Sequence, residues 1–257
     1  MTLEVWVKMI SEELNHRAGP KAEPHRSGFV AIVGRPNVGK STLLNQLLGE
    51  KISIVTPKPQ TTRNRIRGIK TMANAQVVFL DTPGINRAHS LMNRRMVEVA
   101  RATLHEVDGV LWLLDASEKI RTEDEDIARM LAQSEAAVLI LLNKMDLISK
   151  GKLQPLMQRC AELLPGREIV PVSALKGENL PLILDLVVKQ LPEGPRYYPE
   201  GEVTDQTERF LAAEFIREKV FILTREEIPY GVAVMIEEFS EKEERNLIVI
   251  KAAIHAD

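Results

Sequence analysis

Short apolar runs alternate with segments of helical periodicity over residues 29–191, and this rhythm constrains the fold more than any other feature. The runs FVAIVG, QVVFL, GVLWLLD, AVLILLN and EIVPVS have the length of buried strands, and each precedes a helix-like segment. Five such strands alternating with helices predict a parallel, doubly wound α/β sheet. Because ligands bind at the carboxyl ends of strands in these sheets, the turns after the strands are the candidate sites.

Changes in composition divide the chain into four parts. Residues 1–27 hold one short amphipathic turn and the run GPKAEPHRSG, so we expect a flexible extension. Residues 28–191 carry the strand and helix rhythm. Residues 192–206 largely coincide with LPEGPRYYPEGEVTD (191–205), whose prolines and glycines predict a linker.

Residues 207–257 predict a smaller α+β domain. A helix is expected from Thr207 to about Thr224, followed by a strand around 230–239 and by the apolar run LIVIKAAI. No helix follows to cover that last strand. We therefore expect this domain to be incomplete.

The bulk composition narrows the class of protein. Lys and Arg total 34 against 36 Asp and Glu, and this net charge of −2 predicts no general attraction to polyanions. Residues 51–70 nevertheless hold six bases and no acid, which indicates either a polyanion contact or a solvated loop. No run approaches the roughly 20 apolar residues of a membrane span, and the N-terminus lacks a secretory pattern. The lone Cys160 favours packing, and the expected compartment is the reducing cytoplasm.

The segment GRPNVGKS matches the phosphate-binding pattern G-x-x-x-x-G-K-[ST] between a strand and a helix. Its glycines let backbone N–H groups face phosphates, and the helix start adds its positive dipole end. We expect Lys40 to reach the β- and γ-phosphates and the Ser41 hydroxyl to ligate Mg²⁺. A glycine-rich turn without a ligand is the alternative. The predicted nucleotide-binding residues here are Gly34, Asn37, Val38, Gly39, Lys40, Ser41 and Thr42.

The segment DTPG follows directly on the run QVVFL. Asp81 is therefore expected at the carboxyl end of a strand, where its carboxylate would hold the same Mg²⁺ through a water. Gly84 can bring its backbone N–H to a γ-phosphate because no side chain stands in the way. An ordinary turn is the alternative for DTPG taken alone.

The segment NKMD comes at the end of the predicted strand AVLILLN and indicates which base the bound nucleotide carries. A carboxylate at Asp146 can accept both the ring N–H and the exocyclic amine of guanine, and adenine offers no such pair of donors. We therefore expect GTP and GDP rather than ATP, although a helix cap is possible for Asp146 in isolation. The SAL turn would bring backbone N–H groups to the guanine oxygen. The predicted base-binding residues are Asn143, Lys144, Asp146, Ser173, Ala174 and Leu175.

Together these motifs resemble the Ras-like GTPase superfamily over residues 29–191. More narrowly, GRPNVGKSTLLNQLLGEKISIVTPKPQTTRNRI followed by DTPG is similar to the Era branch of bacterial ribosome-assembly GTPases. TERFLAAEFIREKVFILTREEIPYGVAVMIEEF is similar to the start of that branch's RNA-binding KH domain. The resemblance implies a monomeric GTPase that binds small-subunit ribosomal RNA and acts in maturation of the small ribosomal subunit. It also implies peripheral contact with the inner face of the cell membrane.

One departure from this pattern concerns RNA binding. A KH domain clamps nucleic acid with a GXXG loop, whereas Gly231 is the single glycine after Tyr230. Residues 200–250 also hold 13 acids against six bases. We therefore expect this chain to bind GTP and to bind ribosomal RNA weakly.

The resemblance implies two further roles. Thr62, or Thr61 as second choice, would close over Mg²⁺ and the γ-phosphate, unless the pair merely edges a strand. Ras has a water-orienting glutamine after the DTAG-type glycine, but Gly84 is followed by Ile85. A wider group of Era-like GTPases uses the P-loop asparagine to help hold K⁺ near the phosphates, and an asparagine that only tolerates positive φ is the alternative. The expected catalytic residues are Asn37, Lys40, Thr62 and Gly84, and the expected Mg²⁺ residues are Ser41, Thr62 and Asp81.

Rival classes remain open on the sequence. NKMD disfavours a P-loop ATPase or kinase. Competition between ATP and labelled GTP would distinguish these enzymes from a GTPase. A different P-loop GTPase is one further alternative. A GTP-binding scaffold with little hydrolysis is another, and phosphate release with and without ribosomal subunits would distinguish it. Intact Lys40, Ser41 and Asp81 favour an enzyme.

Overall fold

The computed structural model describes residues 24–56, 66–82, 84, 102–224, 232–242 and 247–256. Three expectations fall outside these residues wholly or in large part. They concern the N-terminal extension, the threonine pair Thr61 and Thr62, and most of 91–107, which is the helix-like segment expected after the run QVVFL.

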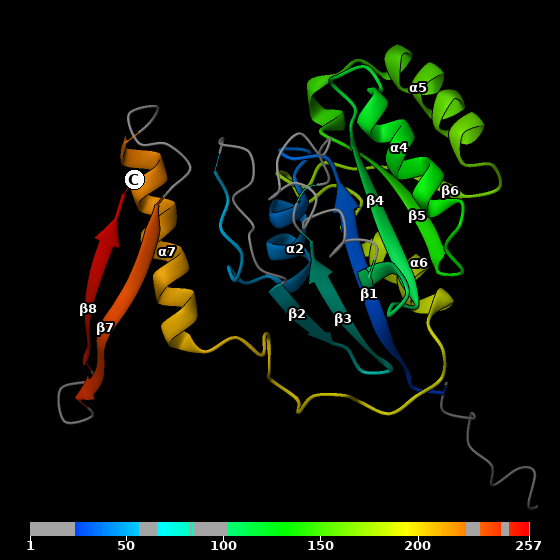
Figure 1. Cartoon of the computed structure of the whole chain (residues 1–257). Helices are drawn as coiled ribbons and strands as arrows, with labels where there is room; N and C mark the ends of the chain where they lie inside the picture. The colour runs from blue at the N-terminus through cyan, green and yellow to red at the C-terminus, as the bar shows by residue number, and fades with distance from the viewer. Residues whose placement is uncertain are drawn as a thin grey trace, which may run out of the picture.

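Six strands form one sheet in the order β2-β3-β1-β4-β5-β6 (Figure 1). Neighbouring strands run parallel, except that β2 pairs antiparallel with β3. This largely parallel sheet confirms the predicted fold class, and β2 is a sixth strand that the apolar runs do not predict. The strands are β1 (Arg26–Gly34), β2 (Ile66–Thr71), β3 (Ala75–Asp81), β4 (Gly109–Asp115), β5 (Ala137–Asn143) and β6 (Glu168–Pro171).

Helices cover both faces of this sheet (Figure 1). One core lies under α2 (Lys40–Leu48) and α6 (Leu180–Gln190), and the other lies under α4 (Thr122–Leu131) and α5 (Lys150–Leu163). Because side chains alternate along a strand, β1 contributes to both cores. Cys160 is buried in the second core, which confirms its packing role.

The segment after α6 runs along the base of the sheet and is hydrogen bonded to it. The Ile69 N–H donates to the Val203 carbonyl at 2.7 Å, and the buried Gln76 carboxamide oxygen accepts from the N–H groups of Tyr197 and Tyr198. These contacts fasten the expected linker to the edge strand β2 and to β3. The same hydrogen bonds fix the path of this segment where it passes the sheet.

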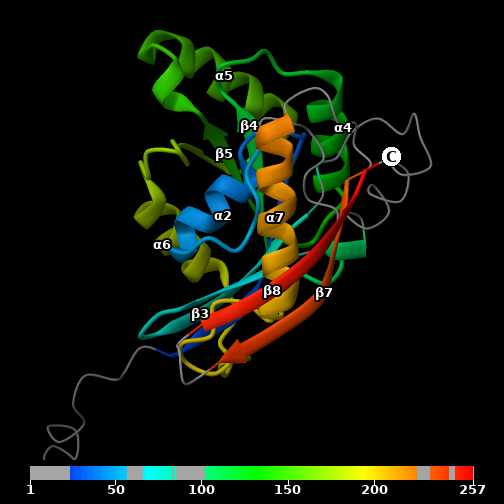
Figure 2. The same cartoon turned by 90° about the vertical axis from the view of Figure 1, so that its left-hand side faces the viewer.

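The remaining elements are α7 (Glu208–Thr224) and the antiparallel hairpin of β7 (Ala233–Lys242) and β8 (Leu247–His255). Figure 2 shows α7 beside this hairpin. The buried Glu218 of α7 reaches the other domain, where it accepts from the Val55 N–H at 2.9 Å and from Lys51. In the described parts of the chain, no helix is both long enough and apolar enough to span a membrane.

Candidate nucleotide-binding site

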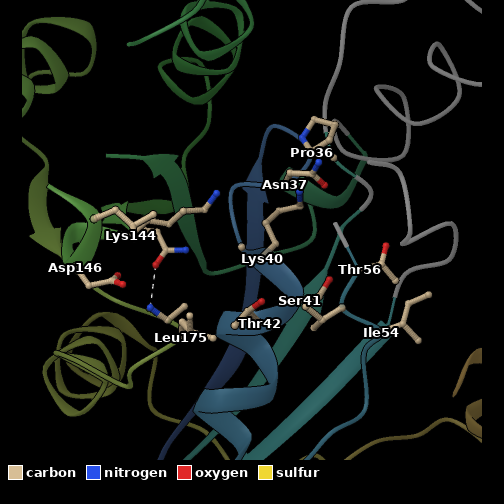
Figure 3. A pocket seen from close by; sticks show the side chains of 16 residues that line it. Pro36, Asn37, Lys40, Ser41, Thr42, Ile54, Thr56, Lys144, Asp146 and Leu175 are labelled. Carbon is tan, nitrogen blue, oxygen red and sulfur yellow. Dashed lines mark hydrogen bonds between the residues drawn. The ribbon is translucent and has the colours of Figure 1, made fainter. Parts of the chain in front are cut away.

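A cavity of about 550 Å³ opens where the carboxyl ends of β1, β3 and β5 meet α2. In Figure 3, Asp146 and Leu175 lie at one end of it, Lys40 lies between, and Ser41, Thr56 and Ile54 lie toward the other end. The predicted residues that line it are Asn37, Gly39, Lys40, Ser41, Thr42, Gly84, Asn143, Lys144, Asp146, Ala174 and Leu175. Gly34, Val38, Asp81 and Ser173 are buried behind its wall, and Thr62 is not among the described residues.

The loop between β1 and α2 has a backbone that few residue types can adopt. Asn37 has φ 63° and Gly39 has φ 101°, both in the left-handed region. A Cβ at Gly39 would stand 2.3 Å from Nδ2 of Asn143, so this position requires glycine. Gly84 approaches the same loop, because a Cβ there would stand 2.7 Å from the backbone nitrogen of Pro36.

Lys40 begins α2, and its ammonium group folds back into the loop. Nζ donates to the carbonyls of Arg35 at 2.9 Å and Gly34 at 3.2 Å. Burial lowers the pKa of Lys40 from its ordinary 10.5 to about 8, although the Asp81 carboxylate opposes that shift. The ammonium can therefore exchange weak carbonyl partners for the negative charge of phosphate groups.

The end of the cavity at Ser41 offers hard oxygen ligands. The Ser41 hydroxyl donates to Oδ2 of Asp81 at 2.8 Å, and the Ser53 hydroxyl donates to the same oxygen at 2.9 Å. A hydroxyl beside a carboxylate, next to a phosphate-binding loop, fits Mg²⁺, which takes few protein oxygens and completes its shell with phosphates and waters. The residues present therefore fit the metal expected from the sequence.

Asn143 and Asp146 shape the opposite end. The Asn143 side chain donates to the Val38 carbonyl at 2.7 Å and accepts the Ala174 N–H at 2.9 Å, which ties the base-side turns to the phosphate loop. The SAL turn lies at this end of the cavity, but its Ala174 N–H is bonded to the Asn143 side chain, a contact that differs from the expected one to the guanine oxygen. The Asp146 carboxylate faces the cavity, with Lys176 Nζ 3.8 Å away.

Lys144 is held by a residue that sequence reasoning missed. Its Nζ donates to Oδ2 of Asp115 at 2.5 Å. Burial raises the pKa of Asp115, but hydrogen bonds from Lys144 and Ser117 outweigh it and hold that pKa below its usual range. The sequence marks Asp115 only as the last residue of the run GVLWLLD, and its contact with Lys144 follows from the register that places it opposite Asn143 on the next strand.

Other contributors were also missed. Ile54, Val55, Thr56 and Leu147 line the cavity, and Ser53 lies behind it. Apart from Leu147, these residues belong to one stretch, KISIVT, in which polar residues interrupt an apolar segment. That mixed pattern is the signal that could have found Ser53 and Thr56.

A phosphate-binding loop between β1 and α2, an aspartate at the end of β3 and an Asn-Lys-x-Asp turn after β5 together define a P-loop GTPase. The family model described as 50S ribosome-binding GTPase matches residues 29–144. GTPase Era of Syntrophus aciditrophicus is 52% identical over 90% of this chain and 76% of its own length. GTPase Era of Geobacter metallireducens is 51% identical over 90% of this chain and 78% of its own length.

Solved structures agree with these relatives. Era in complex with MgGDPNP and nucleotides 1506–1542 of 16S ribosomal RNA is 44% identical, with a TM-score of 0.84 over 91% of this chain and 80% of that one. A point variant of Aquifex aeolicus Era bound to GDP·AlF4⁻ is also 44% identical, with a TM-score of 0.83 over 89% of this chain and 78% of that one. The chain belongs to the Era family of GTPases, and it is a GTP-hydrolysing enzyme.

Proposed function

We propose that this chain is a molecular switch that binds and hydrolyses GTP in the cavity and acts on small-subunit ribosomal RNA during assembly of the small subunit. The observation that carries the proposal is the order of groups along one cavity. Asp146 lies at one end, where it would bind guanine, and Lys40 and Ser41 lie further along, where they would bind the phosphates and Mg²⁺.

Each group has a distinct role in this proposal. The Asp146 carboxylate accepts the two N–H donors of guanine, which fixes the base and rejects adenine. The Lys40 ammonium lies against the β- and γ-phosphates, with backbone N–H groups of residues 37–42 around them. Ser41 and Asp81 hold Mg²⁺, which neutralises charge on the phosphates when bound. The Gly84 N–H faces the γ-phosphate from beside Pro36, since no side chain separates it from the loop.

Hydrolysis needs a further source of stabilisation, because the Ile85 side chain has no group that can hydrogen-bond the attacking water as a glutamine would. We assign that role to a K⁺ ion held with the help of Asn37, which is exposed at the rim of the cavity. Thr62 closes over Mg²⁺ in this proposal, with Thr61 as second choice. Ile54, Val55 and Thr56 line the Ser41 end of the cavity, and this supports an approach of the residues after Thr56 to the metal.

The RNA partner is supported by the solved Era complex that contains a 16S fragment, which this chain matches over both α/β and α+β parts. Glu218 and the linker segment link those parts physically. Residues 200–250 hold 13 acids against six bases, so binding of RNA through this part of the chain is expected to be weak. The proposal also includes a cytoplasmic location with peripheral contact at the inner membrane, which cell fractionation tests.

Phosphate release tests the enzymatic part of the proposal. We expect turnover of GTP but not ATP, faster turnover in K⁺ than in Na⁺ at equal ionic strength, and loss of turnover in Lys40→Ala. Asn37→Ala should lose the K⁺ preference. Equal rates in K⁺ and Na⁺ with unchanged turnover in Asn37→Ala would eliminate the K⁺ role. GTP binding without phosphate release, alone or with small ribosomal subunits, would favour a scaffold.

A binding titration tests the RNA part. A 3′-end fragment of small-subunit ribosomal RNA is added to this chain and, as a control, to the Era protein of Syntrophus aciditrophicus. The control is expected to bind tightly and in a salt-dependent manner, and this chain weakly. Equally tight binding by both would refute the weak-binding expectation. Failure of the control to bind would remove the support taken from the family.

A further inference from the structure

Ser53 is a buried polar residue in the loop after α2, and the roles assigned above do not use it. Its side chain has no exposed surface. Its hydroxyl donates to Oδ2 of Asp81 at 2.9 Å, and the Ser41 hydroxyl donates to the same oxygen at 2.8 Å. Two hydroxyls from different segments therefore converge on one oxygen of the carboxylate expected at Mg²⁺.

The position of Ser53 is set by Asn45, a half-buried residue of α2. The Asn45 carboxamide oxygen accepts the N–H groups of Ile52 at 3.0 Å and of Ser53 at 2.9 Å, and its nitrogen donates to the Ser53 carbonyl at 2.7 Å. The flanking Ile52 and Ile54 are buried. One side chain of the phosphate-loop helix thus holds the backbone of Ser53 through two hydrogen bonds and that of Ile52 through a third.

We propose that Ser53 is a positioning residue that orients the Asp81 carboxylate for Mg²⁺, and that Asn45 acts through Ser53. This inference rests on the proposed nucleotide site and adds a residue to it. A carboxylate can rotate about its Cβ–Cγ bond, and a fixed second donor removes that freedom before the metal arrives. Outer partners of this kind usually contribute about ten- to 100-fold to metal affinity.

A purely structural role for Ser53 predicts a different outcome, and Ser27 provides the matched control. Ser27 is also fully buried, and its hydroxyl donates to the Pro195 carbonyl at 2.7 Å, near the start of β1 and away from the cavity. Either alanine change removes a fully buried hydroxyl and one hydrogen bond, to Asp81 in one case and to the exposed Pro195 in the other. Thermal melting reports the stability that each variant loses, and only Ser53→Ala should alter the response to Mg²⁺.

The test is a titration of a fluorescent GDP analogue at a series of Mg²⁺ concentrations, with thermal melting of the same samples. For Ser53→Ala we expect the Mg²⁺ concentration at half effect to rise about tenfold, with unchanged GDP affinity in EDTA. Ser27→Ala should keep the wild-type midpoint. Asn45→Ala should shift the midpoint in the same direction as Ser53→Ala, and the double variant should add little to either.

The outcomes separate this inference from the proposed site. Wild-type GDP affinity that does not respond to Mg²⁺ would refute the metal assignment of the proposed function and, with it, this inference. A Mg²⁺-responsive wild type with the same midpoint in Ser53→Ala and Ser27→Ala would overturn the role of Ser53 alone. If Ser53→Ala does not fold, the change Asn45→Ala at the half-buried partner decides, because an unshifted midpoint in that variant overturns the proposal.

Discussion

The ammonium of Lys40 is buried against two carbonyls of its own loop, and this burial makes nucleotide binding sensitive to pH. Burial lowers the pKa of Lys40 to about 8, Asp81 raises it in part, and Arg35 lowers it further. Phosphate groups bring negative charge beside the ammonium, so nucleotide binding favours its protonated form. Raising the pH through 8 removes the cation from the nucleotide-free protein and should weaken binding.

The size of the effect follows from that pKa. Roughly nine in ten Lys40 side chains carry the proton at pH 7 and about one in ten at pH 9. If the protonated form alone binds tightly, the dissociation constant for GDP rises about tenfold over this interval, equivalent to roughly 1.4 kcal/mol.

The stability of the nucleotide-free protein should change in the opposite direction. The folded-state pKa of Lys40 lies below the 10.5 of an exposed lysine, so burial of the ammonium costs roughly 3 kcal/mol below pH 8. This cost declines as the pH rises from about 8 to 10.5, because the folded protein has lost the proton while the unfolded chain still holds it, and above 10.5 both are neutral.

The assay compares wild type with Lys40→Met, whose side chain keeps most of the length of the stem without a charge. GDP binding is measured at pH 7, 8 and 9 at constant ionic strength, and nucleotide-free samples are melted at the same pH values. Ionisation of guanine and phosphate affects both proteins equally, so the difference between them isolates Lys40. Lys40→Met should bind weakly without the tenfold change and should melt higher than wild type at pH 7.

Two results would refute this reasoning. An equal pH dependence of GDP binding in both proteins would show that the Lys40 charge is not the group that titrates. A wild type that melts above Lys40→Met at pH 7 would show that burial of the ammonium does not oppose folding.

Three further substitutions probe other parts of the site. Asp146→Asn should weaken GTP and favour xanthosine triphosphate, because an amide presents a donor where the carboxylate accepts, and unchanged base preference in a competition assay contradicts the assignment. Gly39→Ala should lose GDP binding in calorimetry, since its Cβ would stand 2.3 Å from Nδ2 of Asn143; normal affinity would disprove the geometric argument. Glu218→Gln removes the negative charge of the carboxylate that accepts the Val55 N–H at 2.9 Å, so hydrogen exchange of the Val55 amide should accelerate about tenfold. An unchanged exchange rate would contradict the role of this contact.

Sequence reasoning located the nucleotide motifs because each lies within one local unit. A strand, a turn and a helix start place Lys40 and Ser41, and a strand end places Asp81 or Asn143. Periodicity reports the strand, and glycine reports the turn, so no distant contact is needed to find these groups. The same argument explains why the five parallel strands were predictable and the antiparallel β2 was not. IRGIKT lacks a continuous apolar run and becomes a strand by pairing with β3.

The contacts that complete the site join residues far apart in the chain, and tertiary packing alone decides them. Lys144 meets Asp115 because β4 and β5 are neighbours in the sheet, and Ser53 meets Asp81 because α2 turns the chain back over β3. Glu218 reaches Val55 across 163 residues of sequence. Such pairs leave no periodic or spacing signal, because their partners are chosen by the order of strands and the path of loops. The sequence by itself therefore determined the kind of chemistry, whereas the packing of elements decided which side chains hold that chemistry in place.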